Sequence, residues 1–256
     1  MEFRIIALDM DGTLLDAAGQ IPDSFWPVLA ELRARGVAVA PASGRQLATL
    51  QAIFPGDTFI AENGTCVFHE GEIVSTTFLD AATVRAVIDV AGDADMDLVV
   101  CTPTVAYHRP GISPETEKEL EKYYHSRQAT EDLHAVTDVI KLAVFTTDNA
   151  EQTVYPVLLD AAPGASVVVS GAHWVDIMHA EAGKGRALRE LAEAMGVEKR
   201  ETAAFGDYLN DLELLEEAGT AWAMENAHPD IKAIADHIAP PNTEEGVVTV
   251  LRGLLD

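Results

Sequence analysis

Hydrophobic residues are spaced along the first part of the chain in a way that predicts strands and helices in alternation. Apolar runs at residues 4–8, 37–40 and 58–61 have the length of buried strands. Between them, residues 22–35 and 47–53 carry apolar side chains at helical spacing. An order of strand, helix, strand, helix, strand is typical of a parallel sheet with helices on its faces.

The middle of the chain follows a different pattern. Residues 66–69 and 72–76 flank Glu70-Gly71 and predict a hairpin. Beyond the hairpin, predicted strands cover residues 98–102, 140–146 and 166–169, and predicted helices cover residues 81–91, 114–125 and 150–161. This irregular mixture indicates an α+β domain inserted into the chain.

The regular alternation returns after Lys184. Predicted helices cover residues 185–195, 209–217, 229–235 and 243–254, and predicted strands cover residues 202–205 and 220–223. We therefore predict an α/β fold: a Rossmann-like parallel-sheet core with an inserted α+β cap domain. The core would be discontinuous, formed by residues 1–80 and 184–256, with the cap at residues 81–183.

Composition narrows the possible partners of the chain. Its 256 residues include 42 acidic and 17 basic ones, a net charge of −25. Such a charge repels nucleic acids and anionic membranes, so we expect neither as a partner, and a site for an anionic substrate would need a metal ion and local cations.

The sequence carries no signal for export, membrane insertion or stable assembly. No stretch reaches the roughly 20 apolar residues of a membrane span, and the first apolar run is too short for a signal peptide. Cys66 and Cys101 lack the spacing of a metal site or a disulfide framework. We expect a cytoplasmic protein that is a monomer or a weak homo-oligomer.

Polar residues follow three of the predicted parallel strands, at residues 9–13, 43–45 and 207–211. Ligands of open parallel sheets bind outside the carboxyl ends of the strands. The predicted fold would bring these three segments together, although they are far apart in the sequence. The pattern therefore predicts a single site at this edge of the sheet.

Asp9 and Asp11 are the candidate reactive groups at the first strand end. One carboxylate could attack phosphorus and form an aspartyl-phosphate. The other could protonate the leaving oxygen and then deprotonate the hydrolytic water. The dipeptide Asp11-Gly12 is also common in ordinary turns. Asp9 and Asp11 alone therefore do not decide between a reactive site and a turn.

Four short motifs in order resemble those of the haloacid dehalogenase (HAD) superfamily. They are DMDGTLL at residues 9–15, Ser43-Gly44-Arg45, Lys184 followed by Gly185, and GDYLND at residues 206–211. ENG at residues 62–64 and MENA at residues 224–227 resemble the Cof-type phosphatase branch, which has a large α/β (C2-type) cap. The insert matches such a cap only in length and position.

This resemblance implies a magnesium-dependent phosphatase acting on a small phosphate ester, such as a sugar phosphate or a flavin or pyridoxal phosphate. Asp9 would be nucleophile and Mg²⁺ ligand, Asp11 general acid/base with its main-chain carbonyl on the metal, and Asp207 a further ligand. Phosphate or substrate would be bound by Thr13, Ser43, Gly44, Lys184 and Asn210, with Gly12 and Asp211 in supporting roles. The dehalogenase branch lacks a carboxylate at the position of Asp11, which favours phosphoryl transfer here.

Other interpretations of these residues stay open at this point. A phosphomutase would use the same aspartyl-phosphate, and a non-catalytic regulatory domain could bind magnesium and phosphate without turnover. Ser43, Asn210 and Asp211 could instead cap helices, and Lys184 could be a solvated lysine. Within the insert, candidate substrate contacts are Tyr107, His108, Arg109, Trp174 and His179. His173, Asp176 and His179 do not form a clear ligand set, so we predict no metal site there.

Overall fold

The computed structural model describes residues 3–94 and 96–256, which form two compact units. The first unit contains residues 3–43, Gly56–Ser75 and Gly183–Asp256. The second contains Gly44–Pro55 and Thr76–Ala182, and so includes nearly all of the predicted cap.

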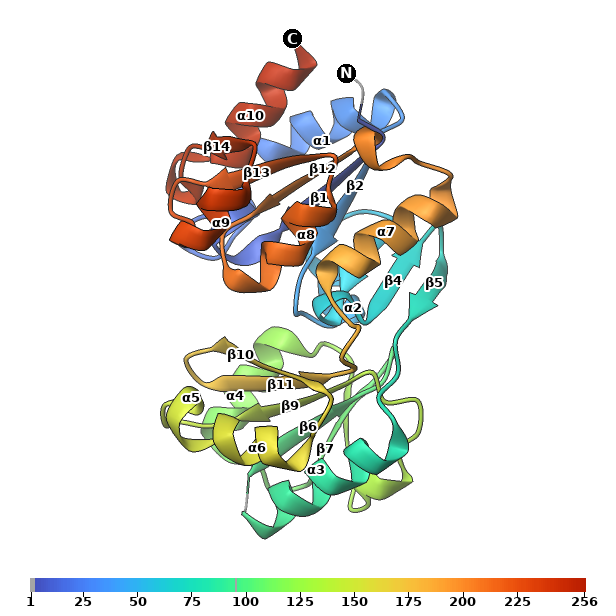
Figure 1. The fold of residues 1–256 in the computed structure, drawn as a ribbon, viewed down its shortest axis with the longest axis vertical. Coiled ribbons are helices and arrows are strands. Elements are labelled where there is room, and N and C mark those ends of the chain that lie inside the picture. The colour runs from blue at the N-terminus through green and yellow to red at the C-terminus, as the bar shows by residue number, and fades with distance from the viewer. Residues whose placement is uncertain (1–2, 95) are drawn as a thin grey trace. The chain divides into compact units, whose positions relative to one another are not determined.

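An eight-stranded sheet forms the centre of the first unit (Figure 1). In spatial order its strands are β14 (His237–Ala239), β13 (Thr220–Met224), β12 (Thr202–Gly206), β1 (Ile5–Asp9), β2 (Ala38–Ala42), β3 (Thr58–Ala61), β4 (Cys66–His69) and β5 (Glu72–Thr76). The strands from β14 to β3 are parallel, and β4 returns antiparallel to β3. Every residue of β1 is buried, as expected of a strand covered on both faces. The predicted α/β fold class is confirmed.

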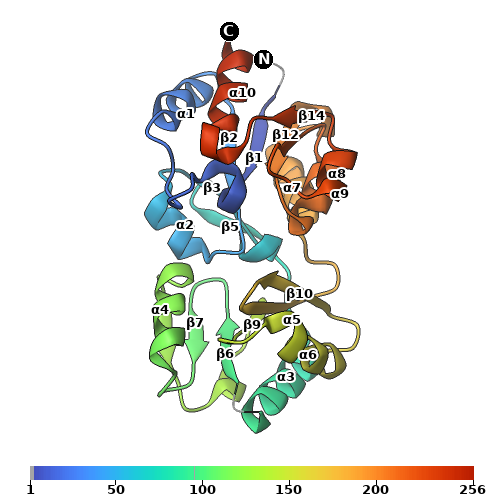
Figure 2. The same cartoon turned by 90° about the vertical axis from the view of Figure 1, so that its left-hand side faces the viewer.

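Helices cover both faces of this sheet (Figure 2). On one face lie α1 (Phe25–Ala34) and α10 (Gly246–Leu255), which contact each other. On the other lie α7 (Lys184–Met195), α8 (Leu212–Glu217) and α9 (Pro229–Ile234), with α8 between its neighbours. Helix α7 buries Ala187, Leu188 and Leu191 at helical spacing and ends at Gly196, whose φ of 61° suits a helix-terminating glycine.

The second unit is built on a six-stranded sheet. Its strands, in spatial order, are β10 (Ser166–Gly171), β11 (Trp174–Met178), β9 (Lys141–Phe145), β6 (Asp97–Cys101), β7 (Ala106–His108) and β8 (Arg127–Ala129). The neighbours from β10 to β7 pair antiparallel, and β7 pairs parallel with β8. This mixed arrangement differs from the parallel sheet of the first unit.

Helices of the second unit pack against this sheet or against one another. They are α2 (Leu47–Ile53), α3 (Ala81–Asp93), α4 (Pro114–Tyr123), α5 (Ala150–Thr153) and α6 (Tyr155–Ala161). One core joins Leu142 and Val144 of β9 with Val87 of α3 and Leu158 of α6. Helix α2 belongs to this unit because Thr49 Oγ1 donates to the Tyr123 carbonyl over 2.8 Å. The prediction had placed this helix in the core.

Several elements differ from the sequence prediction. Strands β7, β8 and β14 were not predicted, because three residues are too few for a recognisable alternation. Strand β11 was also missed, since its buried Asp176, 4.0 Å from Lys141 Nζ, interrupts the apolar pattern. The helix predicted at residues 150–161 is two short helices, and Pro156 in the first turn of α6 cannot continue the hydrogen bonding of α5.

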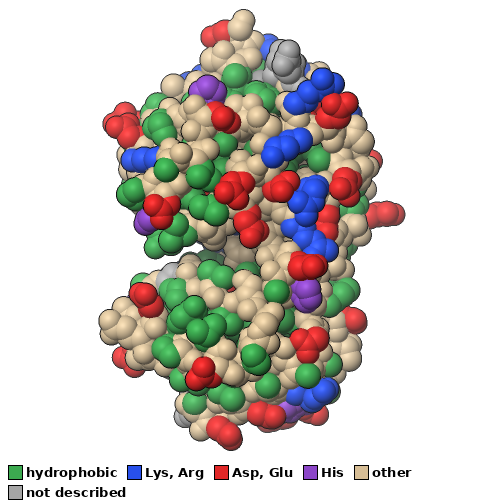
Figure 3. Space-filling model, in the orientation of Figure 1, with side chains coloured by type: hydrophobic (Ala, Val, Ile, Leu, Met, Phe, Trp, Pro, Cys, Tyr) green, Lys and Arg blue, Asp and Glu red, His purple; other side chains and the backbone are tan. Residues whose placement is uncertain are grey.

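Acidic side chains are numerous on the face of the molecule that Figure 3 draws. On the face drawn in Figure 3, Asp and Glu side chains are scattered over both units, with Lys and Arg side chains among them. The net charge of −25 opposes the binding of polyanions. Within residues 3–94 and 96–256, no helix combines the length and apolarity needed to cross a bilayer.

Candidate active site

Three neighbouring parallel strands of the first unit end at the same edge of the sheet. Asp9 is the last residue of β1, Ser43 follows β2, and Asp207 follows β12. Strand β1 lies between the other two, and Asp9 pairs with Ala42, the residue before Ser43. The sheet thus brings together three of the segments that the sequence analysis placed in one site.

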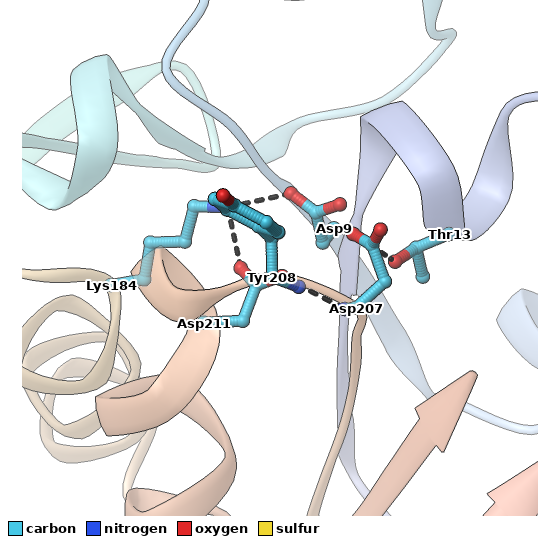
Figure 4. A network of polar contacts seen from close by, with 6 residues as sticks. All are labelled: Asp9, Thr13, Lys184, Asp207, Tyr208 and Asp211. Atoms are coloured by element: carbon cyan, nitrogen blue, oxygen red, sulfur yellow. Dashed lines mark hydrogen bonds and ion pairs between the residues drawn. The ribbon is translucent and has the colours of Figure 1, made fainter. Parts of the chain in front are cut away.

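Lys184 joins two of the carboxylates at this edge (Figure 4). Its Nζ donates to Asp9 Oδ1 over 2.6 Å and to Asp211 Oδ1 over 2.7 Å. Only 1% of Lys184 is exposed, and burial by itself would lower the pKa of its ammonium group. The charges of Asp211 and Asp9 outweigh burial and raise this pKa above its ordinary value, so Lys184 is charged.

Asp211 fixes the turn that carries Asp207. Its Oδ2 accepts from the backbone N–H of Asp207 over 3.1 Å and from that of Tyr208 over 3.4 Å, while its Oδ1 accepts from Lys184. The side chain is completely buried. Asp211 therefore stabilises the start of the short helix as the capping interpretation supposed, and contacts the candidate reactive groups at the same time.

Carboxylate oxygens of Asp9, Asp207 and Asp211 lie within 4.8 Å of one another. Burial first, and then the charge of Asp211, raise the pKa of Asp9 well above its ordinary value and that of Asp207 to about 6. A divalent cation would relieve the crowding of these charges, and a group of oxygen donors is what Mg²⁺ prefers. The residues present therefore fit a magnesium ion.

The exposed carboxylate of Asp11 lies outside this group. In the part of the chain that the structure describes, no other group of three acidic, His or Cys side chains has metal-site geometry.

Gly12 and Thr13 contact Asp207 from the turn after β1. Gly12 has φ 86°, and a Cβ there would lie 2.3 Å from Asp207 Oδ2, so no other residue fits without displacing that carboxylate. Thr13 is buried, and its Oγ1 donates to Asp207 Oδ1 over 3.4 Å. Gly12 leaves room for the Asp207 carboxylate, and Thr13 holds it by a hydrogen bond.

Two asparagines hold the same turn from the opposite end of the chain. Asn226 Nδ2 donates to the Gly12 carbonyl over 2.8 Å, and Asn242 Nδ2 donates to the Leu15 carbonyl over 2.8 Å. The Asn242 backbone N–H also donates to Asn226 Oδ1 over 3.0 Å. Asn226 lies in the MENA segment noted in the sequence, but no role was predicted for it, and no pattern pointed to Asn242.

The remaining candidate residues lie in different surroundings. Ser43 is buried, and its carbonyl accepts from the Asn63 backbone N–H over 2.9 Å. Asn210 is exposed at the start of the short helix after β12. Gly44 belongs to the second unit, where its carbonyl accepts from Lys141 Nζ over 3.0 Å.

The five candidate contacts of the insert have local partners within the second unit. Tyr107 packs against the core of that unit, and the Trp174 ring lies 5.2 Å from the ring of Phe145. His108 Nδ1 lies 2.9 Å from the Arg109 carbonyl, and His179 Nδ1 accepts from the Glu181 backbone N–H over 3.2 Å. The guanidinium group of Arg109 lies next to Gly92. The Trp174 indole nitrogen is buried without a hydrogen-bond partner among the described residues.

Comparison with known proteins gives matches along nearly the whole chain. A family profile described as haloacid dehalogenase-like hydrolase matches residues 6–251. The chain is 29% identical over 263 residues to the 5-amino-6-(5-phospho-D-ribitylamino)uracil phosphatase YbjI of Escherichia coli, covering 100% of this chain and 97% of the relative. It is 28% identical over 243 residues to the HMP-PP phosphatase of Citrobacter koseri, covering 92% and 89%. The solved structure of the HAD subclass IIB sugar phosphatase BT4131 has the same fold, with a TM-score of 0.83 over 98% of both chains at 22% identity.

Proposed function

The chain belongs to the haloacid dehalogenase-like hydrolase family and is a phosphatase, and from this premise we propose a magnesium-dependent reaction through an aspartyl-phosphate on Asp9. The observation that carries the proposal is the contact of Asp9 with Lys184, in a cluster that also contains Asp207 and Asp211. A nucleophilic carboxylate must be ionised, and the Lys184 ammonium group opposes the burial and the Asp211 charge that raise the pKa of Asp9.

Asp9 would attack the phosphorus atom and form a mixed anhydride, while the ester oxygen leaves. Lys184 would remain against Asp9 and offset the charge that gathers there as the phosphoryl group is transferred. Asp9, Asp207 and the main-chain carbonyl of Asp11 would hold the magnesium ion, whose charge would stabilise the phosphoryl oxygens. Thr13, Ser43, the Gly44 N–H and Asn210 would orient the substrate.

Asp11 would act as the general acid and base. It would donate a proton to the leaving alkoxide in the first step and take a proton from water in the second. The exposure of its side chain agrees with a group that must meet substrate and water, in contrast to the buried Asp9. The hydrogen bond that Asn226 makes to the neighbouring Gly12 carbonyl would limit the movement of this turn.

A small phosphorylated metabolite is the substrate class that the relatives support. One relative is named for a ribityl phosphate attached to a pyrimidine, and another for HMP-PP. Both names describe small phosphorylated compounds, in keeping with the sugar, flavin or pyridoxal phosphates expected from the sequence. We assign the first unit to the catalytic core, and the second unit, residues 44–55 and 76–182, to a cap that would select among such compounds.

A panel of phosphomonoesters tests the proposal directly. Release of phosphate would be measured with Mg²⁺ and with EDTA for the wild type, Asp9→Asn and Asp11→Asn. We expect activity only with Mg²⁺, and loss of that activity in Asp9→Asn. Absence of any hydrolysis by the wild type, or full activity of Asp9→Asn, would refute the proposal. Isomerised product without free phosphate would indicate a phosphomutase instead.

A further inference from the structure

Lys184 is flanked by two glycines at the beginning of a helix. Gly183 precedes α7, Lys184 is its first residue and Gly185 its second. Glycine is a poor helix former because it loses the most backbone freedom on folding. A glycine in the first turn of a 12-residue helix therefore suggests a steric requirement at this position.

Gly185 is in contact with the backbone of the neighbouring helix. A Cβ at Gly185 would lie 2.3 Å from the Glu213 carbonyl oxygen and 2.9 Å from Glu213 Cβ. Glu213 is the second residue of α8, two positions after Asp211. The start of α7 thus lies directly against the segment that supplies one carboxylate partner of Lys184, with no room for a side chain between them.

Gly64 touches the same peptide of α7 from another direction. It follows β3 with φ 92°, and a Cβ there would lie 2.3 Å from the Gly183 carbonyl oxygen and 2.8 Å from the Lys184 nitrogen. The preceding residues Glu62 and Asn63 also have positive φ, at 52° and 56°. Three successive residues in this unusual conformation form the turn that reaches Lys184.

We infer that Gly64 and Gly185 are positioning residues for the proposed reaction: they let the turn after β3 and helix α8 close on the backbone of Lys184 and fix its ammonium group between Asp9 and Asp211. The two hydrogen bonds of 2.6 and 2.7 Å leave little tolerance for movement of that backbone. The inference rests on the proposed function, because it assigns a catalytic consequence to the position of Lys184.

Gly183 offers a control within the same segment. A Cβ there would lie 2.2 Å from Glu213 Oε2, which is the end of a flexible side chain on an exposed residue. Its φ of −179° is extended and open to any residue. The carboxylate of Glu213 can swing away from an alanine at residue 183, whereas the backbone atoms that face Gly64 and Gly185 cannot.

The experiment compares kcat and KM for p-nitrophenyl phosphate with Mg²⁺ in four variants: Gly185→Ala, Gly64→Ala, Gly183→Ala and Gly253→Ala. Gly253 lies within α10 and has open space where its Cβ would be. We expect kcat of Gly185→Ala and Gly64→Ala to fall about 100-fold, as for a misplacement of about 1 Å. We expect Gly183→Ala and Gly253→Ala to stay within about threefold of the wild type. Equal losses in Gly183→Ala and Gly185→Ala would overturn the inference.

A double-mutant cycle separates positioning from general damage to the fold. If Gly185 acts through Lys184, then Gly185→Ala should cause no further loss of kcat in a Lys184→Ala background. Independent, additive losses would contradict the inference. So would failure of both Gly64→Ala and Gly185→Ala to fold, since a positioning role predicts folded proteins with low activity.

A crystal structure of Gly185→Ala gives a result that does not depend on turnover. The distance from Lys184 Nζ to Asp9 or Asp211 should exceed hydrogen-bond range, and unchanged distances would overturn the inference. If the wild type hydrolyses no phosphomonoester, the proposed function fails, while this structural comparison still tests the closure around Lys184.

Discussion

Lys184 Nζ lies 2.6 Å from Asp9 Oδ1, although 175 positions separate the two residues in the sequence. The same ammonium group is 2.7 Å from Asp211, and all three side chains are almost fully buried. One buried ammonium group thus forms ion pairs with two buried carboxylates, which have little access to water. The pair is therefore important both for the stability of the first unit and for the proposed chemistry.

Replacing Lys184 by methionine should destabilise the protein strongly. The variant keeps the buried Asp9 and Asp211 but removes their cation, and breaking a buried pair in this way costs about 3–5 kcal/mol. We expect the melting temperature in EDTA to fall by roughly 10 °C at pH 7.5. Lys118→Met, a change at an exposed lysine, is the matched control and should melt within about 2 °C of the wild type.

The difference in melting temperature between Lys184→Met and the wild type should become smaller as the pH falls. Without the ammonium group, the already raised pKa of Asp9 should rise further, so the folded variant binds a proton that the unfolded chain releases. Folding then gains stability towards low pH. A difference that stays constant between pH 7.5 and 5.5 would show that the lost contact is not mainly electrostatic.

Asp207→Asn should separate stability from metal binding. The pKa of Asp207 is raised to about 6 in the folded protein, from 3.8, by burial first and by Asp211 second. An acid whose pKa is raised in the folded state destabilises the fold as the pH rises from 3.8 to about 6, and the full penalty applies above the folded pKa. At pH 7.5 in EDTA we therefore expect Asp207→Asn to melt about 2–4 °C above the wild type.

Addition of Mg²⁺ should raise the melting temperature of the wild type but not that of Asp207→Asn, because ligands that bind the folded state stabilise it. Differential scanning calorimetry with and without the metal measures both effects. An equal metal-induced rise in the two proteins would exclude Asp207 as a ligand.

Magnesium affinity should depend on pH through the same carboxyl group. Metal binding requires ionised ligands, so protons compete with Mg²⁺ below the pKa of about 6 on Asp207. Isothermal titration calorimetry measures the dissociation constant, which should increase as the pH falls through this value. Below pH 6 we expect it to rise about tenfold per pH unit. A constant value down to pH 5 would mean that these carboxylates are not the ligands.

Much of the site could be predicted because its residues follow apolar runs that become parallel strands. Asp9 and Asp207 each close or follow such a run, and parallel strands place their ends at one edge. Lys184 was identified by resemblance to a known motif, since nothing in a lysine at the start of a helix indicates that it is buried. The sequence therefore predicted which strand ends lie side by side, but not the contacts between their side chains.

The supporting contacts could not be predicted, because they join backbone atoms that are distant in the sequence. Asn226 and Asn242 bind carbonyl groups of residues 12 and 15, a relationship that only the assembled fold creates. The burial of Asp211 and its hydrogen bond with Lys184 could not be predicted either, because the sequence around Asp211 is typical of a helix cap. Strands β7 and β14 were not predicted for a different reason: each is only three residues long.

Asp11→Asn should slow the reaction in proportion to the basicity of the leaving group. A general acid contributes about 10²–10⁴-fold when a poor leaving group must be protonated. The p-nitrophenolate ion leaves without a proton, so its departure should hardly change. We therefore expect kcat/KM, which reports the first step, to fall about 100-fold or more for an alkyl phosphate and less than about tenfold for p-nitrophenyl phosphate. Equal losses for both esters would argue against the acid role.

Trapping the phosphoryl group on Asp9 would test directly whether this carboxylate is the nucleophile. In Asp11→Asn with p-nitrophenyl phosphate, the first step should proceed while the second lacks its base, so the intermediate should accumulate. Acid quenching followed by borohydride reduction would convert an aspartyl-phosphate to homoserine, and peptide mass spectrometry would locate it. We expect homoserine at position 9, and none after the additional change Asp9→Asn. Homoserine at another aspartate, or no modified residue during active turnover, would contradict this expectation.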